Sequence, residues 1–576
     1  MAGGSNPAPR RGPWARLWPW LAVLAFWLWS AWPLLVWTDT QAFAGKLTTD
    51  NVVSAWFYDF ASRALASGWD LQTLSQLNHP RPHATSVEFP AVMDAVLAAP
   101  LGWLFGWPRQ WGAAQALALL VNGLGGAALA RSLGARGLGT VAAGCLAILC
   151  RPVWKDLVMA RMNAVWPGIG ALALAGLVAA LGARRARAAI AWAALAAGMG
   201  ALAATIYPPG LLLLAPLGVA LVSGPAIEAR WSRRALALAA LAGGLALAAP
   251  ELHRILESRS GQAGLGELGC PDRWAALNAV DLWRSRPNGS QGLSEPALVL
   301  TSWALAPLAL LHRRWRTALA ALAVCGAYLV LSLGPCTEWT EGVAWPLGRV
   351  AGVGPALTEA WRLAGPLHDF GRFAGVAVVG AAVLFGLGID GLAGRGRVRA
   401  TLAAAIAAAT IGHVQWVVLS ERMSPAKWHD ARPPATARFL AALPAGELGP
   451  AAELPFDRKQ QFLSLIGAPE PPRLNPLRPG DHPPVRQPIV EFIYALGWGQ
   501  LANLPDAPPA ADATRVRWVF FSSNRCHTGG VRAAACDPKV PAALTEALGS
   551  PRALDDGTLV WAVGGWGPAA TALSRE

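Results

Sequence analysis

Charged residues are scarce in this sequence. Only 14% of its 576 residues are Asp, Glu, Lys or Arg, whereas 54% are hydrophobic. Soluble domains carry roughly 25% charged residues. A deficit of this size is typical of a chain that lies largely in hydrocarbon, so the composition argues against a soluble globular protein.

Motifs that would indicate a soluble enzyme or a metal site are also missing. The sequence contains no Walker motif, no GxSxG and no HExxH, which excludes the P-loop, hydrolase-elbow and zinc-protease signatures. No CxxC pair or His/Cys cluster has the spacing of a metal site. The segment Gly123-Leu-Gly125-Gly126 lies inside an apolar run without a preceding strand, so it indicates close helix packing rather than dinucleotide binding.

A series of apolar runs extends from residue 17 to residue 420. The first, 17–37, is longer than the core of a signal peptide, so we favour a retained anchor over cleavage at Ala42-Phe43-Ala44. We predict an α-helical polytopic membrane protein with about eleven, or twelve, transmembrane helices. The later runs lie at 91–107, 111–130, 138–151, 164–182, 189–206, 210–224, 235–250, 296–311, 317–334, 373–393 and 400–420.

The arginines between these runs predict the orientation in the membrane. The net charge of +14 is concentrated in short connectors, which favours topology and contact with anionic membrane lipids over nucleic-acid binding. By the positive-inside rule, the N-terminus (1–16) and four connectors face the cytoplasm. An inside N-terminus and an outside C-terminus require an odd number of spans. Either 91–107, which contains Asp94 and Pro100, is re-entrant or interfacial, or 138–151 is not a complete crossing. The four connectors contain Arg184, Arg185 and Arg187; Arg230, Arg233 and Arg234; Arg313, Arg314 and Arg316; and Arg395, Arg397 and Arg399.

The C-terminal segment, 421–576, differs from the rest of the chain. It is rich in Pro and charge and contains no span. Strand-like runs at 517–521 and 558–563 enclose a helical stretch at 541–548, so we predict a small α/β domain outside the membrane. Cys526 and Cys536 can form a disulfide there if the segment is extracytoplasmic. Cys270 and Cys336, in two predicted outer loops, are a second candidate pair.

The first outer loop, 38–90, contains the main catalytic candidate. Asp50 follows the first span and precedes a short amphipathic helix expected near 52–66. At that depth a carboxylate can act as general base on the hydroxyl of an acceptor beside a lipid-linked substrate; the alternative is that Asp50 only caps the helix. His83 can contact a phosphate or sugar. Weaker acidic candidates are Asp59, Asp70, Glu88 and Asp94.

Cations on the predicted outer side indicate an anion site. Lys155 and Arg161 follow a span that exits outside, against the positive-inside trend, and suggest binding of a lipid phosphate. The alternative is that this segment is cytoplasmic. Arg372 directly precedes the run 373–393, where it either binds a phosphate or snorkels to the interface.

The layout resembles the type C superfamily of polyprenyl-phosphate-dependent membrane glycosyltransferases, in particular poorly characterised bacterial branches. The motifs that carry the resemblance extend over nearly the whole chain. They are Asp50 in TTDN; Glu88-Phe89-Pro90; the Gly-rich run ending at Arg131; Cys150-Arg151-Pro152; Arg372-Phe373; and, in the tail, Glu453-Leu454-Pro455 with RWVFF at 517–521.

The resemblance implies a function and a set of partners. It implies transfer of a sugar from a polyprenyl-phosphate carrier to a glycan or lipid acceptor on the outer side of the bacterial inner membrane. Asp50 would be the base, and Arg161 and Arg372, with Lys155 as an alternative, would bind the carrier phosphate. No cofactor is expected; Asp50 lacks the second carboxylate of a DxD pair, which leaves a divalent metal open. The alternative functions are a non-enzymatic transporter of lipid-linked glycan, an assembly factor or a lipid-binding relative.

Overall fold

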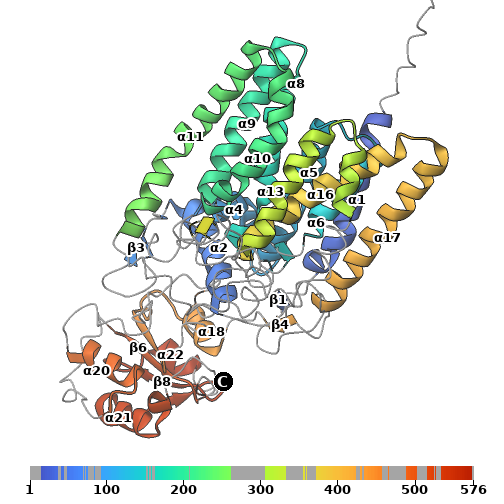
Figure 1. The fold of residues 1–576 in the computed structure, drawn as a ribbon. Helices are drawn as coiled ribbons and strands as arrows, with labels where there is room; N and C mark the ends of the chain where they lie inside the picture. Colours follow the sequence, from blue (N-terminus) through green and yellow to red (C-terminus); the bar gives the residue numbers. More distant parts are fainter. Residues whose placement is uncertain are drawn as a thin grey trace, which may run out of the picture. The chain divides into compact units, whose positions relative to one another are not determined.

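The computed structural model is mostly helical (Figure 1). It describes residues 14–36, 41–44, 49–68, 71, 73–74, 83–84, 92–150, 153–154, 157, 162–206, 208–260, 305–332, 355–356, 359, 371–422, 428–430, 434–456, 465, 488–501, 516–523, 526 and 533–573. The chain forms two compact units, and neither is continuous in sequence. Unit 1 comprises 1–36 and 114–427, and unit 2 comprises 37–113 and 428–576. The sequence predicted a division into 17–420 and 421–576. In the structure, the first loop instead belongs to the same unit as the C-terminal segment.

The elements described in unit 1 are helices. They are α1 (Trp14–Leu35), α5 (Arg109–Ser132, which begins in unit 2), α6 (Leu138–Ile148), η1 (Met162–Val165), α8 (Pro167–Gly182), α9 (Ala186–Ile206), α10 (Pro208–Glu228), α11 (Trp231–Ser260), η3 (Ala306–Leu311), α13 (Trp315–Ser332), α16 (Gly371–Ala393) and α17 (Arg397–Arg422). Helices α8, α9, α10 and α11 lie side by side (Figure 1).

Within the described residues, five helices are long and apolar enough to cross a membrane: Leu17–Leu35, Arg109–Ser132, Ala186–Ile206, Trp231–Arg254 and Val376–Ala393. Large apolar side chains are exposed on them, for example Leu238 (65%), Leu245 (56%) and Leu247 (67%) on α11. Hydrocarbon is the solvent that such a surface needs. The chain is therefore a multi-pass membrane protein, as predicted.

Helices α4 and α6 are among the apolar helices that are too short for a complete crossing. Helix α4 (Met93–Phe105) has 13 residues and α6 has 11. At about 1.5 Å per residue they extend about 20 and 16 Å, against roughly 30 Å of hydrocarbon. These are the two segments for which the sequence allowed an incomplete crossing, and the total number of spans stays a prediction.

The glycine-rich run of α5 allows close contact between helices, as its sequence indicated. A Cβ atom at Gly125 would lie 2.4 Å from the carbonyl oxygen of Gly168 at the start of α8. Beside it, Asn122 Nδ2 donates to the Val165 carbonyl at 2.9 Å, and its Oδ1 accepts from the Gly168 N–H at 2.7 Å. Because the first N–H groups of a helix have no partner within it, Asn122 serves as a remote cap for α8.

The C-terminal residues of unit 2 form a four-stranded sheet with helices packed against it. The strand order is β5-β6-β8-β7, with β5 parallel to β6 and the other pairs antiparallel. The expected strands at 517–521 and 558–563 are β6 (Trp518–Phe521) and β8 (Leu559–Ala562), and the expected helix at 541–548 is α21 (Lys539–Leu548). The further elements of the C-terminal part are α18 (Ala435–Ala442), β5 (Ala451–Leu454), α20 (Pro488–Gly497), η9 (Ala533–Cys536), β7 (Arg552–Ala553) and α22 (Pro568–Leu573).

Apolar layers cover both faces of this sheet. Residues alternate between the two faces of a strand, so Val519 and Phe521 of β6 pack with α20 and α21 residues, whereas Trp518 and Phe520 pack with Phe439 of α18. Because the residues of β6 are buried on both faces of the sheet, WVFF is a continuous apolar run in the sequence.

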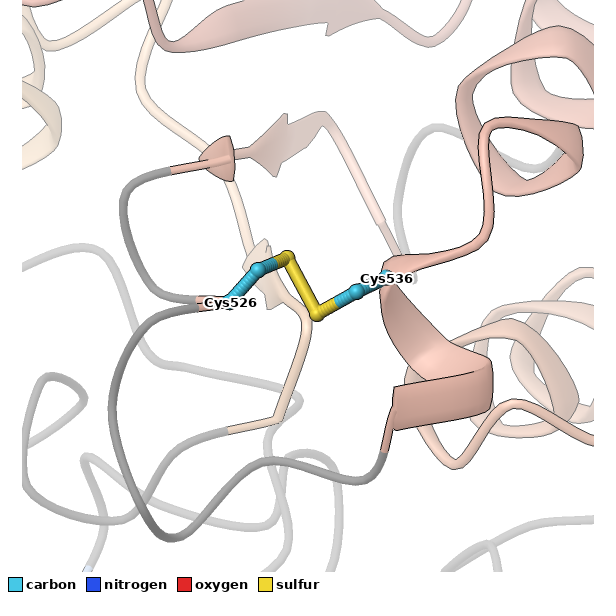
Figure 2. Close-up of a disulfide and its surroundings, with 2 residues drawn as sticks. All are labelled: Cys526 and Cys536. Carbon is cyan, nitrogen blue, oxygen red and sulfur yellow. A yellow bond between two sulfur atoms is a disulfide. The ribbon is translucent and has the colours of Figure 1, made fainter.

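A disulfide joins Cys526 to Cys536 (Figure 2). The two Cα atoms are 5.6 Å apart, within the usual range for a bridge. The structure thus confirms the pairing expected from the sequence. Cys270 and Cys336 lie outside the described residues. Cys145, Cys150 and Cys325 are buried in the helices or at their ends, as expected for small core residues.

Candidate functional site

The main catalytic candidate lies at the start of α2 (Thr49–Ser67), the helix that follows α1 in sequence. Asp50 is the second residue of α2, one position inside the helix. The positive end of a helix dipole favours a carboxylate at this position. The helix expected at 52–66 is therefore present and begins three residues earlier.

Helix α2 is buried on nearly all sides, which the expected amphipathic pattern did not predict. From Val52 to Ala64 only Ser54 and Arg63 are partly exposed. Its aromatic side chains pack against one another and against α5, with Trp56 and Phe60 stacked at 5.4 Å and Tyr58 edge-on to Trp111 at 5.4 Å. A helix that is buried on nearly all sides belongs in a core. The amphipathic interpretation was wrong because the few polar residues of α2 find internal partners.

The best-defined polar contact in this core joins α2 to α4. The hydroxyl of Tyr58 donates to Oδ2 of Asp94 at 3.0 Å, and Asp94 is only 5% exposed. Asp94 lies in the first turn of the short helix α4, which does not span the membrane. Burial raises the pKa of the Asp94 carboxyl to about 6, and the hydrogen bond from Tyr58 opposes this rise. A carboxyl group with a pKa near 6 exchanges its proton close to neutral pH.

Further hydrogen bonds join α2, α4 and the start of α5. Gln110 of α5 donates to the Tyr58 carbonyl at 2.9 Å. Ser62 donates to the Ala99 carbonyl at 3.1 Å, and Trp103 donates to the Ser62 carbonyl at 2.8 Å. These bonds use carbonyls of α2 and α4 that a buried helix must satisfy. They hold α2, and with it Asp50, against α4 and the start of α5.

An ion pair lies further along α2. Both Nε and Nη2 of Arg63 donate to Oδ2 of Asp59, at 3.1 and 2.8 Å. Nη2 also reaches the Leu465 carbonyl at 3.4 Å. Asp59, a weaker catalytic candidate, is therefore engaged by its own helix at i,i+4 spacing.

Short strands flank α2 in sequence. Strand β1 (Gln41–Ala44) pairs antiparallel with β4 (Trp428–Asp430), which follows the last helix of the bundle. Strand β2 (Thr73–Leu74) pairs with β3 (His83–Ala84), and His83 is opposite Leu74. The first loop is thus held by pairing at both of its ends, once to the distant residues 428–430.

The other candidate site residues are placed as follows. Arg372 is the second residue of α16, directly before the apolar stretch 376–393. Lys155, Arg161, Glu88 and Asp70 lie outside the described residues. Sequence reasoning missed Tyr58 and Gln110. Their signal was a phenol and an amide inside otherwise apolar stretches, where buried polar groups need partners.

The described part of the chain contains no group of three or more His, Cys, Asp or Glu side chains that could hold a metal ion. Asp59 and Asp94 have separate partners, Arg63 and Tyr58.

Neither a protein-family model nor a curated protein sequence matches this chain. Among solved structures, the mycobacterial arabinofuranosyltransferase AftD matches 96% of this chain with a TM-score of 0.51 and 17% identity. The chain spans only 42% of the length of AftD. Two further matches have lower TM-scores and carry no argument. They are the oligosaccharyltransferase from Archaeoglobus fulgidus (TM-score 0.48, 13% identity, 95% of this chain and 72% of that one) and ArnT from Cupriavidus metallidurans (0.43, 15%, 95% and 98%).

The likeness to AftD extends over both units and is a likeness of fold, since the identity is low. The likeness covers both the first loop, where Asp50 follows the first span, and the C-terminal segment that follows the last helix of the bundle. The fold expected from the sequence is thus confirmed by its likeness to the fold of AftD.

Proposed function

We propose that the protein is a membrane glycosyltransferase that moves a sugar from a polyprenyl-phosphate carrier to a glycan or lipid acceptor. The observation that carries the proposal is the position of Asp50. It lies in the first turn of a buried helix that follows the first span, in a chain that shares its fold with an arabinofuranosyltransferase. The chain spans less than half of that enzyme. The substrates proposed for this chain therefore follow from the chemistry of its own candidate residues.

The proposed reaction needs one base and one phosphate-binding group. Asp50 takes the proton from the acceptor hydroxyl, whose oxygen then attacks the anomeric carbon of the sugar. The bond between that carbon and the phosphate oxygen breaks, and the polyprenyl phosphate leaves with an added negative charge. Arg372 and Arg161, with Lys155 as an alternative, neutralise this charge. His83 and Glu88 contact the sugar or phosphate.

The proposal places the reaction on the outer side of a bacterial inner membrane. The arginine-rich connectors predict a cytoplasmic N-terminus and an outer C-terminal segment. The disulfide between Cys526 and Cys536 supports this side, because disulfides persist in oxidising compartments and are rare in the cytosol. Polyprenyl-phosphate sugars present their headgroups at the membrane surface, and in the sequence Asp50 follows the first span.

The first experiment separates catalysis from transport. Purified protein in detergent is given polyprenyl-phosphate sugars and membrane-derived acceptors, and loss of the donor is followed by chromatography. Donor consumption with release of free polyprenyl phosphate supports the transferase. The same donors are then placed in one leaflet of proteoliposomes containing the protein. Movement of intact donor between leaflets without consumption in detergent would instead show a transporter of lipid-linked glycan.

A further inference from the structure

A cluster of arginines lies at one end of unit 1, where three helix connections meet. It consists of Arg136 before α6, Arg313 and Arg314 before α13, and Arg395 after α16, and is here termed the arginine junction. Nothing in the proposed reaction uses these residues, which belong to a different unit from α2.

A small network of side chains brings the connections together. Oδ1 of Asp390, near the end of α16, accepts from the Arg136 N–H at 2.8 Å. Oδ2 of Asp390 is 3.6 Å from Nε2 of the buried His312, whose Nδ1 accepts from the Arg314 N–H at 3.3 Å. Nη2 of Arg395 donates to the Leu311 carbonyl at 3.3 Å. The network fixes the backbones of the four arginines relative to one another.

The side chain of Arg313 folds back onto the connection between α5 and α6. Gly134, with a φ of +107°, lies under its guanidinium, so a Cβ atom there would come within 2.6 Å of Nη2. Glycine at this position both adopts the left-handed backbone and leaves room for the arginine. The guanidinium of Arg313 therefore lies beside Gly134, two residues before Arg136.

Arg314 has a buried side-chain donor without a partner in the described part of the chain. Its Nη1 is buried and has no hydrogen-bond partner among the described residues. Burial lowers the pKa of its guanidinium; the charge of Glu228 opposes this change, and the charge of Arg313 adds to it. Asp390 is engaged by the backbone N–H of Arg136 and lies beside the ring of His312. A buried donor on a charged group that lacks a partner indicates the place of an anion.

The junction lies where lipid headgroups would be. Trp315 directly follows Arg314 and is 48% exposed, and Leu319, one turn into α13, is 50% exposed. On α11, Trp231 is 79% exposed beneath the guanidinium of Arg234. Exposed tryptophans followed by exposed leucines mark the boundary between headgroups and hydrocarbon. The anions present in bulk at this boundary are the phosphodiesters of acidic lipids.

We propose that the arginine junction binds the phosphodiester headgroup of an anionic phospholipid, with Arg313 and Arg314 as its principal ligands. Arginine suits this role because its planar fork donates two parallel hydrogen bonds to a phosphate. The acyl chains then lie along the exposed leucines of the adjacent helices. The proposal does not depend on the proposed transferase activity.

The test is lipid binding by the full-length protein in detergent. Phosphatidylglycerol, phosphatidylcholine and inorganic phosphate are titrated separately, and the midpoint of thermal unfolding and the bound lipid in native mass spectra are measured. Wild type should bind phosphatidylglycerol more tightly than phosphatidylcholine and gain thermal stability from it. Arg313→Gln/Arg314→Gln should bind it at least about tenfold more weakly, as expected for the loss of a charge-assisted hydrogen bond.

The matched control is Arg397→Gln/Arg399→Gln. It removes the same charge from two exposed positions at the start of α17 and should keep the wild-type affinity. Equal loss in both double variants would reduce the effect to net charge and overturn the proposal. A shift by inorganic phosphate at the same concentration as the lipid would overturn the lipid as the source. If the double variant does not fold, the exposed Arg313→Gln alone carries the test.

Discussion

The hydroxyl of Tyr58 donates a 3.0 Å hydrogen bond to a buried carboxylate oxygen of Asp94. This bond crosses from α2, the helix that begins with the candidate base, to the short helix α4. Both partners are buried, so the contact is shielded from water, and its strength depends on the protonation of Asp94.

Replacing Asp94 by Asn should change how stability depends on pH. The pKa of Asp94 is about 6 in the folded chain against 3.8 ordinarily, so the folded state holds a proton that the unfolded state has released. The free energy of unfolding of the wild type should therefore fall as pH rises from about 4 to 6, by on the order of 3 kcal/mol. Asp94→Asn should lack this fall. Thermal unfolding in detergent across this range measures the difference, with the exposed Glu546→Gln as control; parallel curves for wild type and Asp94→Asn would contradict the account.

Tyr58→Phe should move the titration of Asp94 upward. The phenol stabilises the carboxylate form, and a hydrogen bond to a charged group is worth about 1.5–3 kcal/mol, or roughly one pKa unit or more. The pH midpoint is obtained by comparing Tyr58→Phe with Tyr58→Phe/Asp94→Asn, so that only Asp94 differs. An unchanged midpoint would mean that the phenol does not interact with the carboxylate in solution.

Gly125→Ala should destabilise the helix bundle. The added methyl would lie 2.4 Å from the Gly168 carbonyl oxygen, a backbone atom that cannot rotate away. Overpacking of this kind costs about 1–3 kcal/mol. Gly198→Ala is the matched control, since a Cβ there meets nothing within 4 Å. Thermal unfolding should show a lower midpoint for Gly125→Ala alone; equal midpoints would show that α5 and α8 do not approach so closely.

The disulfide offers a test of the membrane side. The test uses a chain in which Cys270 and Cys336, the other cysteines expected outside, are replaced by Ser. In intact cells, a membrane-impermeant phosphine followed by an impermeant maleimide should label this chain but not the same chain with Cys526→Ser/Cys536→Ser added. Labelling that appears only after lysis would place the C-terminal segment in the cytoplasm.

The purified variant Cys526→Ser/Cys536→Ser should also lose about 2–4 kcal/mol of stability, because the bridge closes a loop in the unfolded chain.

Features encoded locally were predictable from the sequence. Helix α2, strands β6 and β8 and helix α21 follow from short patterns of apolar residues, and the bridge between Cys526 and Cys536 follows from two nearby cysteines in a polar segment. The glycines of α5 predicted close packing because only residues without a side chain allow two backbones to approach so closely.

Features that depend on distant residues were not predictable. Nothing in Gln41–Ala44 specifies its pairing with Trp428–Asp430, and nothing near Tyr58 specifies Asp94 as its partner. Such contacts depend on how distant strands pair and distant helices pack. The spacing of apolar residues within one segment does not determine either. For the same reason α2 was expected to be amphipathic, although its polar groups are satisfied inside a core.

The most direct test of the proposed mechanism is the rate of sugar transfer by Asp50→Asn relative to wild type. Both proteins are given the same polyprenyl-phosphate sugar in detergent, and donor binding and thermal unfolding are measured in parallel. Loss of a general base typically costs about 10²- to 10⁴-fold in rate. The account predicts a loss in this range with intact fold and donor binding, and unchanged transfer by Glu546→Gln. Transfer by Asp50→Asn at the wild-type rate would contradict it.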